Sequence, residues 1–590
     1  MQTLLATDDF KKRSHGEASY FTRPVIENVQ PEIDSGRFPV KRILHDKVLV
    51  TADIYTDGID ALSAVLLYRR VGDETWRECL MHELRNDSWC GGFKVDQLVP
   101  YEYTIEAWIV AHADRRGAVR YDRILRVTVD PPAASFCAWY ELFPRSTGTD
   151  PHRSATFREA ELRLPGVAAM GFSVVYLPPI HPIGTSFRKG PNNSVQSGPQ
   201  DPGSPWAIGS AHGGHKSVDP ALGTIADFDH FVQAAHQKGL DVALDLAYQC
   251  SPDHPYIQDH PEWFRHEPDG SVKHAENPPK KYEDIVPFDF ECDAWPALWK
   301  ELKDVVLFWI GHGIDQFRVD NPHTKPYRFW EWLIQEIQHE HPGTLFLAEA
   351  FTRPKPMRYL AKCGFTQSYT YFTWRNTKEE LTTYLMELTQ PPISDYLRRN
   401  FFTNTPDILS SYLQTGGRAA HQVRLLLAAT LSSAYGIYGP SFELCENRAL
   451  PNSEDYQDSE KYQIRVWDWD RPGNIKEFIA RVNHARRENA ALQSNESLRF
   501  CSIESEHLIA YLKYTQDLSN IILTIVNLDT AHAQWSYVKL PLADLGIKEG
   551  DSYHMHDLLS DADYVWRGER NFVRLDPAIS PGHLFRLSAS

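Results

Sequence analysis

The feature that most constrains the fold is a regular alternation of short apolar segments and longer amphipathic segments from about residue 136 to residue 490. The apolar segments include FSVVYLPPIHP, DVALDLAYQ, DQFRVD and TLFLAEAF, and amphipathic segments such as IADFDHFVQAAHQKG and YRFWEWLIQEIQHEHP lie between them. Strand and helix patterns that alternate over short turns are typical of parallel βα units. The length and regularity of the repeat favour a (β/α)8 TIM barrel, of class α/β, over an open doubly wound sheet. No GxGxxG or GxxxxGK[ST] motif follows these strands, which argues against a nucleotide site.

Both flanks of the predicted barrel read as β-rich domains. Upstream, KVLVTADIYT, LSAVLLYRRV, YEYTIEAWIV and RILRVTVD alternate apolar and polar residues, a pattern typical of a β-sandwich, and downstream LIAYLKYT, NIILTIVNLD and HLFRLS return to strands. We therefore predict an N-terminal β-sandwich domain at 1–132, the barrel at 133–493 and a C-terminal β-sandwich domain at 494–590. A stretch rich in Gly, Pro, Asn and Ser, about 184–290, is predicted to be an irregular inserted B-type region at the barrel face, where long loops tend to be functional.

Charge and cysteine usage limit the partners and the compartment. The net charge of −17 argues against nucleic acid or an anionic membrane as the main partner, because no broad basic surface would neutralise phosphates. The 8 cysteines lie far apart with no CxxC pair, as expected for reduced thiols. The N-terminal residues contain no apolar run long enough for a signal peptide, and no later segment approaches a membrane span. We expect a cytoplasmic protein.

Carboxylates follow the ends of several predicted barrel strands. DQFRVD ends on Asp320, LFLAEAF contains Glu349 near its end, Asp407 follows FFTN, and Asp245 lies within DVALDLAYQ. In a parallel barrel the catalytic residues lie where the strands end. One such carboxylate alone is more simply explained as the N-cap of the next helix. Three of them, with Arg318 beside Asp320, indicate carboxylates that converge on one pocket.

Two of these carboxylates have surroundings that would separate their protonation states. Arg318 and Asp320 are on the same side of a strand by its two-residue period, and a neighbouring cation favours an ionised carboxylate. Glu349 follows the apolar run LFLA, where burial would raise its pKa. A retaining glycosyl-transfer enzyme needs one ionised nucleophile and one protonated acid/base, with Asp407 available to bind sugar hydroxyls.

Several long strings of the sequence resemble a known family. RVDNPHTKP, FLAEAFTRP, QSYTYFTWRNTKEEL, NFFTNTPDIL, HAENPPKKYEDI and DSEKYQ are similar to the α-amylase superfamily (glycoside hydrolase family 13), and within it to maltosyltransferases that use maltose 1-phosphate. The resemblance runs from ENVQPEIDSGRFPVKR to the barrel end. It implies that Asp320 is the nucleophile, Glu349 the general acid/base and Asp407 the transition-state stabiliser. It also implies a donor site made of Lys189, Gln249, Asp284, Asn321, Lys461 and Tyr462, with further contacts from Asn193, Asn277, Lys280 and Tyr282.

The irregular segments independently favour a phosphorylated donor. Lys189, Asn193, Asn277 and Lys280 all lie in them, and an acidic protein that binds a phosphate ester needs a local group of cations and amide donors. A solvated loop surface explains the KK pair alone more simply. Above a carboxylate pocket, the phosphate interpretation is favoured.

The sequence also departs from the family pattern. DLAYQC stands where ordinary α-amylases have His and Asn after the third strand, so we expect no structural calcium, and no metal or cofactor is expected elsewhere. Pro406 precedes the third carboxylate, as in the maltosyltransferases. Well-known members carry a helical insert before the barrel that takes part in dimerisation. RVTVDPPAASFCAWYELFPRS leaves no room for it, so a homodimer is possible but in doubt.

The function predicted from these features is retaining transfer of maltosyl from α-maltose 1-phosphate, or a related glycosyl donor, to the 4-OH of an α-1,4-glucan acceptor, with release of phosphate. Two alternatives stay open. An amylase-superfamily hydrolase or phosphorylase acting on another donor would be indicated by starch hydrolysis that does not depend on phosphate. A non-catalytic glucan-binding protein would bind glucan without turnover of any donor.

Overall fold

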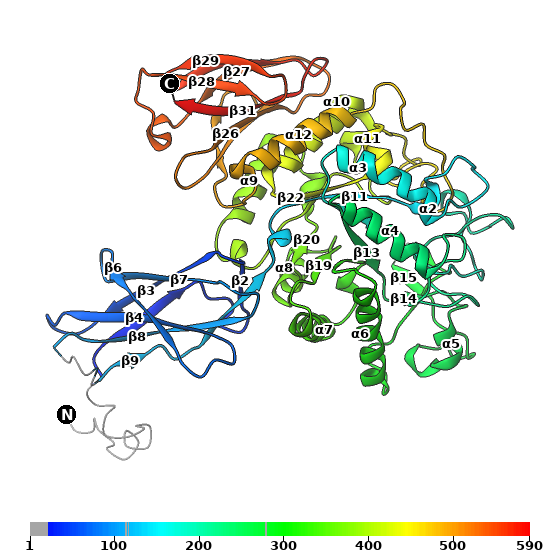
Figure 1. Cartoon of the computed structure of the whole chain (residues 1–590), viewed down its shortest axis with the longest axis horizontal. Coiled ribbons are helices and arrows are strands. Elements are labelled where there is room, and N and C mark those ends of the chain that lie inside the picture. Colours follow the sequence, from blue (N-terminus) through cyan, green and yellow to red (C-terminus); the bar gives the residue numbers. More distant parts are fainter. Residues whose placement is uncertain (1–21, 112–114, 116, 278–279, 590) are drawn as a thin grey trace, which may run out of the picture. The chain divides into compact units, whose positions relative to one another are not determined.

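The computed structural model describes residues 22–589 except 112–114, 116 and 278–279. The chain forms two compact units (Figure 1). The first contains the residues up to Pro132 together with Pro391–Tyr396, and the second contains Ala133–Gln390 and Leu397–Ser590. The three-domain boundaries proposed from the sequence stay a prediction.

The first unit consists of two sheets. One has the order β1 (Val25–Gln30), β3 (Lys47–Tyr55), β7 (Ser88–Lys94) and β6 (His82–Glu83). The other has the order β2 (Val40–Ile43), β10 (Leu125–Asp130), β8 (Tyr101–Ile109), β4 (Leu62–Arg70) and β5 (Arg77–Leu80), with β9 (Val119–Arg120) paired to β8. Every second residue of β3 is buried, and the Phe93 ring of β7 stacks 4.4 Å from the Tyr68 ring of β4. The sheets therefore pack face to face, as the alternating sequence pattern predicts.

Eight parallel strands form the barrel. In chain order they are β11 (Cys137–Glu141), β12 (Val174–Leu177), β13 (Asp241–Leu246), β18 (Gln316–Val319), β19 (Leu345–Ala348), β20 (Gln367–Ser368), β21 (Phe401–Phe402) and β22 (Ala434–Tyr438). Neighbours in the chain pair from β11 to β20 and from β21 to β22, and β11 also pairs with β22, so that β20 and β21 are the two ends of the sheet. Ser368 closes the ring beside β21, because its N–H donates to Arg398 O and its carbonyl accepts from Asn400 N, both at 2.9 Å. The TIM-barrel prediction is confirmed.

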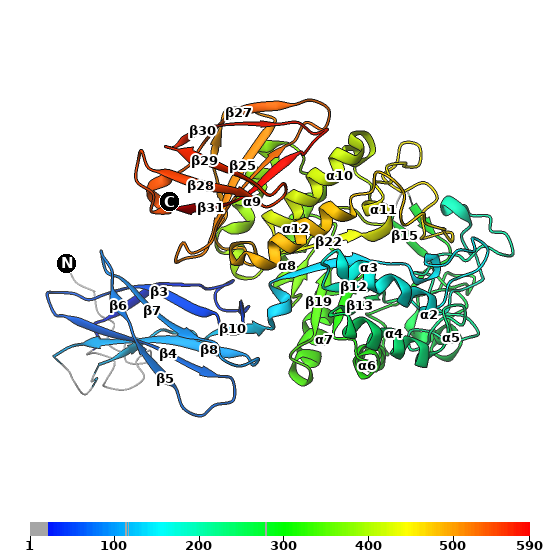
Figure 2. The same cartoon turned by 45° about the horizontal axis from the view of Figure 1, so that its top comes forward.

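Helices surround the barrel strands (Figure 2). They are α2 (Phe157–Ala160), α3 (Leu164–Ala169), α4 (Ile225–Gln237), α6 (Trp295–Gly311), α7 (Tyr327–Glu340), α8 (Pro354–Lys362), α9 (Lys378–Thr389), α10 (Ser411–Leu431), α11 (Gly439–Glu443) and α12 (Lys476–Glu488). In α7 the buried side chains are Phe329, Trp330, Leu333, Ile334 and Ile337, a single stripe at helical spacing. Burial of that stripe against the strands accounts for the helix better than intrinsic propensity does.

The predicted inserted region is two separate loops, one between β12 and α4 and one between β13 and α6. The first contains the turn η5 (Pro191–Asn193). The second contains β14 (Gln249–Cys250), α5 (Pro255–Asp259), β15 (Ala275–Asn277), β16 (Lys280–Tyr282) and β17 (Val286–Pro287). β14 pairs with β17 and β15 with β16, so the second loop is built on short antiparallel ladders, where the sequence predicts irregular structure.

The connection from β10 to β11 is short, as the sequence indicates. Residues 131–136 alone join them and form the turn η2 (Pro132–Ala134), with no helical insert.

The C-terminal part of the second unit contains two further sheets. The larger has the order β23 (Arg499–Phe500), β25 (Leu508–Tyr514), β26 (Ile521–Asn527), β31 (Gly582–Ala589), β28 (Ser552–Asp557) and β29 (Ala562–Arg567). The smaller has the order β24 (Ser502–Ile503), β27 (Gln534–Lys539) and β30 (Arg570–Leu575). A core that includes Leu523, Val538 and Phe585 lies between them. No helix in the described part of the chain has the length and apolar character needed to cross a membrane.

Candidate active site

Arg318 organises the carboxyl ends of three neighbouring barrel strands. Its Nη1 lies 2.7 Å from Asp245 Oδ2 on β13 and 2.9 Å from Asp320 Oδ1 just beyond β18, and its Nη2 lies 2.5 Å from Glu349 Oε1 just beyond β19. The strand register explains this convergence, since Arg318 pairs with Asp245 on one side and with Leu347 on the other. The guanidinium side chain is only 5% exposed. A buried cation shared among carboxylates is a strong constraint on their positions.

The pKa values of Asp320 and Glu349 move in opposite directions. Burial raises the pKa of Glu349, and the charges of Asp320, Asp407 and Asp245 add to the rise against the effect of Arg318, leaving it at about 8. Burial also tends to raise the pKa of Asp320. The positive charges of Arg318, Lys325 and Lys461 outweigh that effect and hold it below its ordinary value. At neutral pH one carboxyl is therefore protonated beside another that is ionised.

Asn321 connects these two carboxyls through an unusual backbone conformation. It has a φ of 43°, in the left-handed region that non-glycine residues seldom adopt. In this conformation its N–H donates to Glu349 Oε2 at 3.2 Å, and its Nδ2 donates to Asp320 Oδ2 at 3.4 Å. The amide predicted to contact the donor is thus held between the nucleophile and acid/base candidates.

Lys325 binds the backbone on both sides of Asn321. Its Nζ donates to Asp320 O at 3.2 Å, to Asn321 O at 3.3 Å and to Thr324 Oγ1 at 3.3 Å. Two successive carbonyl groups converge on one ammonium because the left-handed residue between them turns the chain. Lys325 therefore stabilises the conformation that positions Asn321.

Asp407 is paired with a second cation, Lys461, which is partly buried. Both of its carboxylate oxygens accept from Lys461 Nζ, at 2.7 and 2.8 Å. The same Nζ lies 4.9 Å from the centre of the Trp206 ring and 5.7 Å from that of Tyr462. Burial tends to lower the pKa of Lys461, but Asp407 and its neighbours raise it well above the ordinary value, so the ammonium stays charged.

A cavity of about 990 Å³ opens in front of these groups. Lys189 reaches it from the first inserted loop, where it is 3% exposed and its Nζ lies 2.6 Å from Glu283 Oε2. Burial raises the pKa of Asp284, which lines the same cavity. The residues from the sequence prediction that line the cavity are Asp320, Glu349, Asp407, Lys189, Asn193, Gln249, Tyr282, Asp284, Asn321, Lys461 and Tyr462.

Arg318 is not among the residues that line the cavity, and it contacts Asp320 and Glu349 from the side of the barrel. For Asn277 and Lys280 the structure describes only the backbone, in which they pair across the β15–β16 hairpin. The predicted side-chain contacts of both residues fall outside the described part of the structure.

Three residues of this arrangement had no role in the sequence prediction. Asp245 is fully buried on Arg318, and burial raises its pKa to about 7. Tyr176 Oη donates to Asp245 Oδ2 at 2.5 Å. Asp245 lies beside Arg318 through the pairing of β13 with β18, which cannot be read from the spacing of the two residues along the chain. For Lys325 the available signal was its position in RVDNPHTKP, five residues after Asp320.

One buried group could be considered for a metal. The ligand atoms of His215, Cys250 and His254 lie within 4.8 Å of one another. Tyr256 N–H donates to His254 Nδ1 at 3.0 Å, so His254 Nε2 carries the proton in the 3.0 Å contact with His215 Nδ1. His215 Nε2 then donates to Ala247 O at 3.0 Å. The four ring nitrogens are all engaged in one neutral hydrogen-bond chain, and a metal on His254 Nε2 would leave two N–H groups facing each other at Tyr256.

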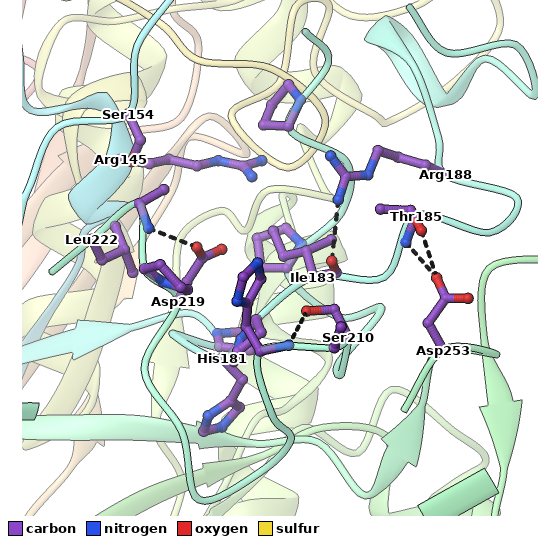
Figure 3. A pocket seen from close by; sticks show the side chains of 18 of the residues that line it. Arg145, Ser154, His181, Ile183, Thr185, Arg188, Ser210, Asp219, Leu222 and Asp253 are labelled. Atoms are coloured by element: carbon purple, nitrogen blue, oxygen red, sulfur yellow. Dashed lines mark hydrogen bonds between the residues drawn. The ribbon is translucent and has the colours of Figure 1, made fainter. Parts of the chain in front are cut away.

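A second cavity, of about 770 Å³, lies beside the first inserted loop and contains no predicted site residue (Figure 3). Arg145 and Arg188 reach into it, with Asp219 below them. Arg188 donates to the carbonyls of Ile183, Gly184 and Asp201, and Arg145 donates to those of Gly203 and Glu460. Both guanidinium groups therefore hold loop backbone in place. The bond from Arg145 to Glu460 O fixes the backbone directly before Lys461.

Comparisons with known proteins agree over nearly the whole chain. A family model described as alpha-1,4-glucan:maltose-1-phosphate maltosyltransferase, domain N/S, matches residues 22–119, and one described as GLGE, C-terminal, matches residues 500–587. A protein named alpha-1,4-glucan:maltose-1-phosphate maltosyltransferase from Chlorobaculum tepidum is 47% identical, and the match covers 96% of each chain. One of the same name from Myxococcus xanthus is 46% identical over 95% of this chain and 97% of its own.

Solved structures show the fold. A noncanonic maltogenic α-amylase from Thermotoga neapolitana matches with a TM-score of 0.59 and 19% identity, over 78% of this chain and 100% of its own. An α-amylase from Geobacillus thermoleovorans matches with a TM-score of 0.59 and 16% identity, over 77% of this chain and 98% of its own.

Proposed function

Because this chain belongs to the α-1,4-glucan:maltose-1-phosphate maltosyltransferase family, we propose that it transfers maltosyl groups from α-maltose 1-phosphate to the non-reducing 4-OH of α-1,4-glucans. Phosphate is the leaving group, and the anomeric configuration is retained. The enzyme is a glycosyltransferase of α-glucan biosynthesis, built on an α-amylase barrel.

In the first step we assign Asp320 as the nucleophile and Glu349 as the acid. Asp320 Oδ1 is held by Arg318, which leaves Oδ2, bonded at 3.4 Å by Asn321, as the attacking oxygen. Oδ2 forms a bond to the anomeric carbon while the bond from that carbon to the phosphate oxygen breaks. The electron pair leaves with the phosphate, and Glu349 donates its proton to that oxygen. The product is a β-maltosyl ester of Asp320.

In the second step Glu349 acts as the base. It takes the proton of the acceptor 4-OH while that oxygen attacks the anomeric carbon from the face the phosphate has left. The ester bond breaks, and Asp320 recovers its negative charge beside Arg318. Two inversions at one carbon give net retention. Asp407 is proposed to bind hydroxyl groups of the donor sugar while the ring distorts.

The observation that carries this proposal is the opposite protonation of two carboxyls on one guanidinium. Arg318 contacts both Asp320 and Glu349, yet the pKa of the first is lowered and that of the second is raised to about 8. A retaining mechanism needs that pair of states before the donor arrives.

The charges around the cavity support a phosphate leaving group. Lys189, Lys325 and Lys461 line the cavity within a protein of net charge −17, and Asn193 and Asn321 add amide donors to the same lining. Local cations can bind a phosphate ester in a protein whose long-range field repels it. An amylase-superfamily hydrolase acting on an uncharged donor has no need of this set.

The test is phosphate release from α-maltose 1-phosphate in the presence of maltohexaose. We expect one phosphate for each maltosyl unit added to an acceptor chain, no release without acceptor beyond slow hydrolysis, and none from Asp320→Ala. Starch hydrolysis that proceeds without phosphate or donor would instead favour a hydrolase. Glucan binding with no turnover of any donor would favour the non-catalytic alternative.

We further propose that the reaction takes place in the cytoplasm. All eight cysteines are unpaired, as expected in a reducing compartment. The mass of the protein in solution tests whether two copies associate without the helical insert.

A further inference from the structure

The outer face of the smaller C-terminal sheet carries exposed aromatic side chains. Along β27 and β30 one set of residues alternates inward, including Val538 and Val573, and the other set alternates outward. The outward set contains Trp535, which is 62% exposed, and Phe572, which is 52% exposed. Contiguous aromatic side chains that face water often mark an interaction surface.

The rings form one continuous strip. Tyr537 lies directly opposite Phe572 in the strand register, and Trp535 lies opposite Arg574. The centres of the Trp535 and Phe572 rings are 6.1 Å apart with their planes inclined at 33°, and those of Tyr537 and Phe572 are 5.6 Å apart. Arg570 lies over the Tyr537 ring at 3.8 Å and closes the strip at its far end. We call these three rings, Trp535, Tyr537 and Phe572, the aromatic strip.

The charges beside the aromatic strip do not select an ionic partner. Each flanking cation has a carboxylate neighbour: Arg570 with Glu504 at 2.9 Å, Lys539 with Glu569 at 3.1 Å and Arg574 with Asp576 at 4.0 Å. Exposed pairs of this kind contribute little stability and leave donors and acceptors open to water. The surface thus offers flat apolar rings surrounded by neutralised hydrogen-bonding groups. A pyranose presents the matching features, a C–H face and a rim of hydroxyls.

The aromatic strip belongs to the same compact unit as the catalytic cavity. α10 begins four residues after Asp407, and in its first turn Tyr412 Oη donates at 2.7 Å to Leu528 O, in the segment that leads into β27. On the neighbouring strand, Lys378 Nζ at the start of α9 donates to Ile503 O at 2.8 Å and to Ser505 O at 3.1 Å. β24 and the entry to β27 are therefore fixed to helix N-termini, the ends of those helices that follow the catalytic ends of the strands. Figure 2 shows β27 and β30 side by side at the outer edge of the C-terminal part.

We propose that the aromatic strip binds a segment of the α-1,4-glucan chain, outside the catalytic cavity. The choice of an α-1,4-glucan rests on the proposed function, which gives the enzyme a polymer far longer than one cavity. The inclined rings suit this polymer, because α-1,4 linkages curve the chain and turn successive sugar faces, whereas a straight chain would need coplanar rings. Sugars would stack on Trp535 and Phe572, with the hydroxyls bonded by Arg574, Lys539 and Glu504.

The test compares Trp535→Ala, Phe572→Ala and the double variant with the parent enzyme by native electrophoresis in gels containing amylose, glycogen or no polysaccharide. We expect amylose and glycogen to retard the parent enzyme and the double variant to lose at least five-fold in apparent affinity. Trp535→Tyr keeps a ring at this position and should retain most of the retardation. Val565→Ala, at an apolar position on β29 that is 66% exposed, is the matched control and should behave like the parent. Phosphate release with maltohexaose should be unchanged in all of these variants, while extension of glycogen slows in the double variant.

Each outcome has a distinct meaning. Equal retardation of the parent and the double variant would place all glucan binding in the catalytic cavity and overturn the proposal. A change in solution mass between the parent and the double variant, at equal glucan affinity, would identify the aromatic strip as a contact between copies of this chain. Absence of phosphate release from the parent would refute the proposed transferase reaction, and the electrophoresis would still decide the glucan surface by itself.

Discussion

At the scale of single residues, one guanidinium and two lysines determine which carboxyls of the site carry a charge. Arg318 contacts three carboxylates within 2.9 Å, Lys325 holds the backbone of the nucleophile candidate, and Lys461 binds Asp407. Each of these cations also acts on the pKa of Asp320. The ionisation of the site is therefore a collective property, and removal of one member should be visible in the pH dependence of the reaction.

The proton on Glu349 predicts an alkaline limit to activity. Since this carboxyl must be protonated to act as the acid, activity should be lost as the pH rises through its pKa of about 8. kcat/KM should then fall about ten-fold for each further pH unit, as measured by phosphate release at saturating maltohexaose. The second ionisation of the donor phosphate, near pH 6, affects the acid side only.

A control identifies the group responsible. Glu349→Gln should lose most activity, and the residual rate should no longer show this limb. If the residual activity of Glu349→Gln still falls at the same alkaline pH, another group is responsible for that fall.

Lys325 is expected to act on the reaction by positioning Asp320 and Asn321, through their backbone carbonyls and without contact with the reacting atoms. In Lys325→Met the two carbonyls that flank Asn321 lose their shared donor, and a buried charge that lowers the pKa of Asp320 is removed. We expect kcat to fall about 100-fold, the order of effect that a misplaced catalytic group produces, and the acid limb of the pH profile to move to higher pH. Both are read from phosphate release across a pH series.

The matched control is Lys273→Met, an exposed lysine that lines the same cavity. It should leave kcat and the acid limb in place. A Lys325→Met enzyme with an unshifted acid limb would show that the lysine serves stability alone.

At the scale of secondary-structure elements, the helix that precedes β13 illustrates how local sequence secures the barrel. Thr224 is the N-cap of α4, where its Oγ1 accepts from Asp227 N at 3.2 Å and its N–H donates to Asp227 Oδ2 at 3.0 Å. Thr224→Ala should lower the free energy of unfolding by about 1 kcal/mol and leave kcat unchanged. Thr415→Ala is the control, because that hydroxyl bonds back to Ser411 O inside α10 and caps no helix. Denaturant midpoints for both variants measure the difference, and equal midpoints would contradict the prediction.

The elements also show which parts of the fold the sequence could predict. β12, β18 and β19 are buried along their whole length, and β12 and β19 read as continuous apolar runs, so their existence and their catalytic ends could be predicted. β20 contains only two residues, and Ser368 completes the barrel through tertiary hydrogen bonds that no local pattern reveals. The β14–β17 and β15–β16 ladders escape prediction because Gly, Pro, Asn and Ser, which are typical of loops, dominate the local sequence.

The same limit applies to the site. Asp320, Glu349 and Asp407 could be identified because each follows a strand, and Arg318 because it lies two residues before Asp320. Asp245 binds Arg318 across a strand pair, and the role of Lys325 depends on the left-handed conformation of Asn321. Neither fact is encoded in spacing along the chain.

At the scale of the whole molecule, the first unit takes in a segment from the middle of the chain. Pro391–Tyr396 belongs to it, and within it Asp395 Oδ1 lies 2.8 Å from Arg42 Nη2. The chain then returns to the second unit at Leu397, enters β21 and reaches Asp407. The entry to one catalytic strand therefore starts in the other unit.

This connection predicts a cost for removal of the N-terminal unit. A chain that begins at residue 133 leaves Pro391–Tyr396 without the rest of its unit, although no residue before 133 that the structure describes lines the 990 Å³ cavity. We expect at least a ten-fold loss in phosphate release and a lower thermal midpoint. Arg42→Met, which removes the ion pair with Asp395 and a hydrogen bond to Lys41 O, should have a far smaller effect. Full activity in the shortened chain would show that the segment before β21 needs no partner.

The segment at 391–396 also determines an order of events during synthesis. The ribosome completes the sheets of the first unit by residue 132, but 264 further residues, from 133 to 396, must be added before the last piece of that unit exists. At about 5–20 residues per second, the nascent N-terminal unit lacks the segment 391–396 for on the order of 13–53 s. During this interval six barrel strands emerge, and none of them can close the ring, because β21 follows the missing piece. Chaperone demand should thus be greatest for this protein between residues 133 and 396 of its synthesis, when two incomplete structures share one unfinished chain.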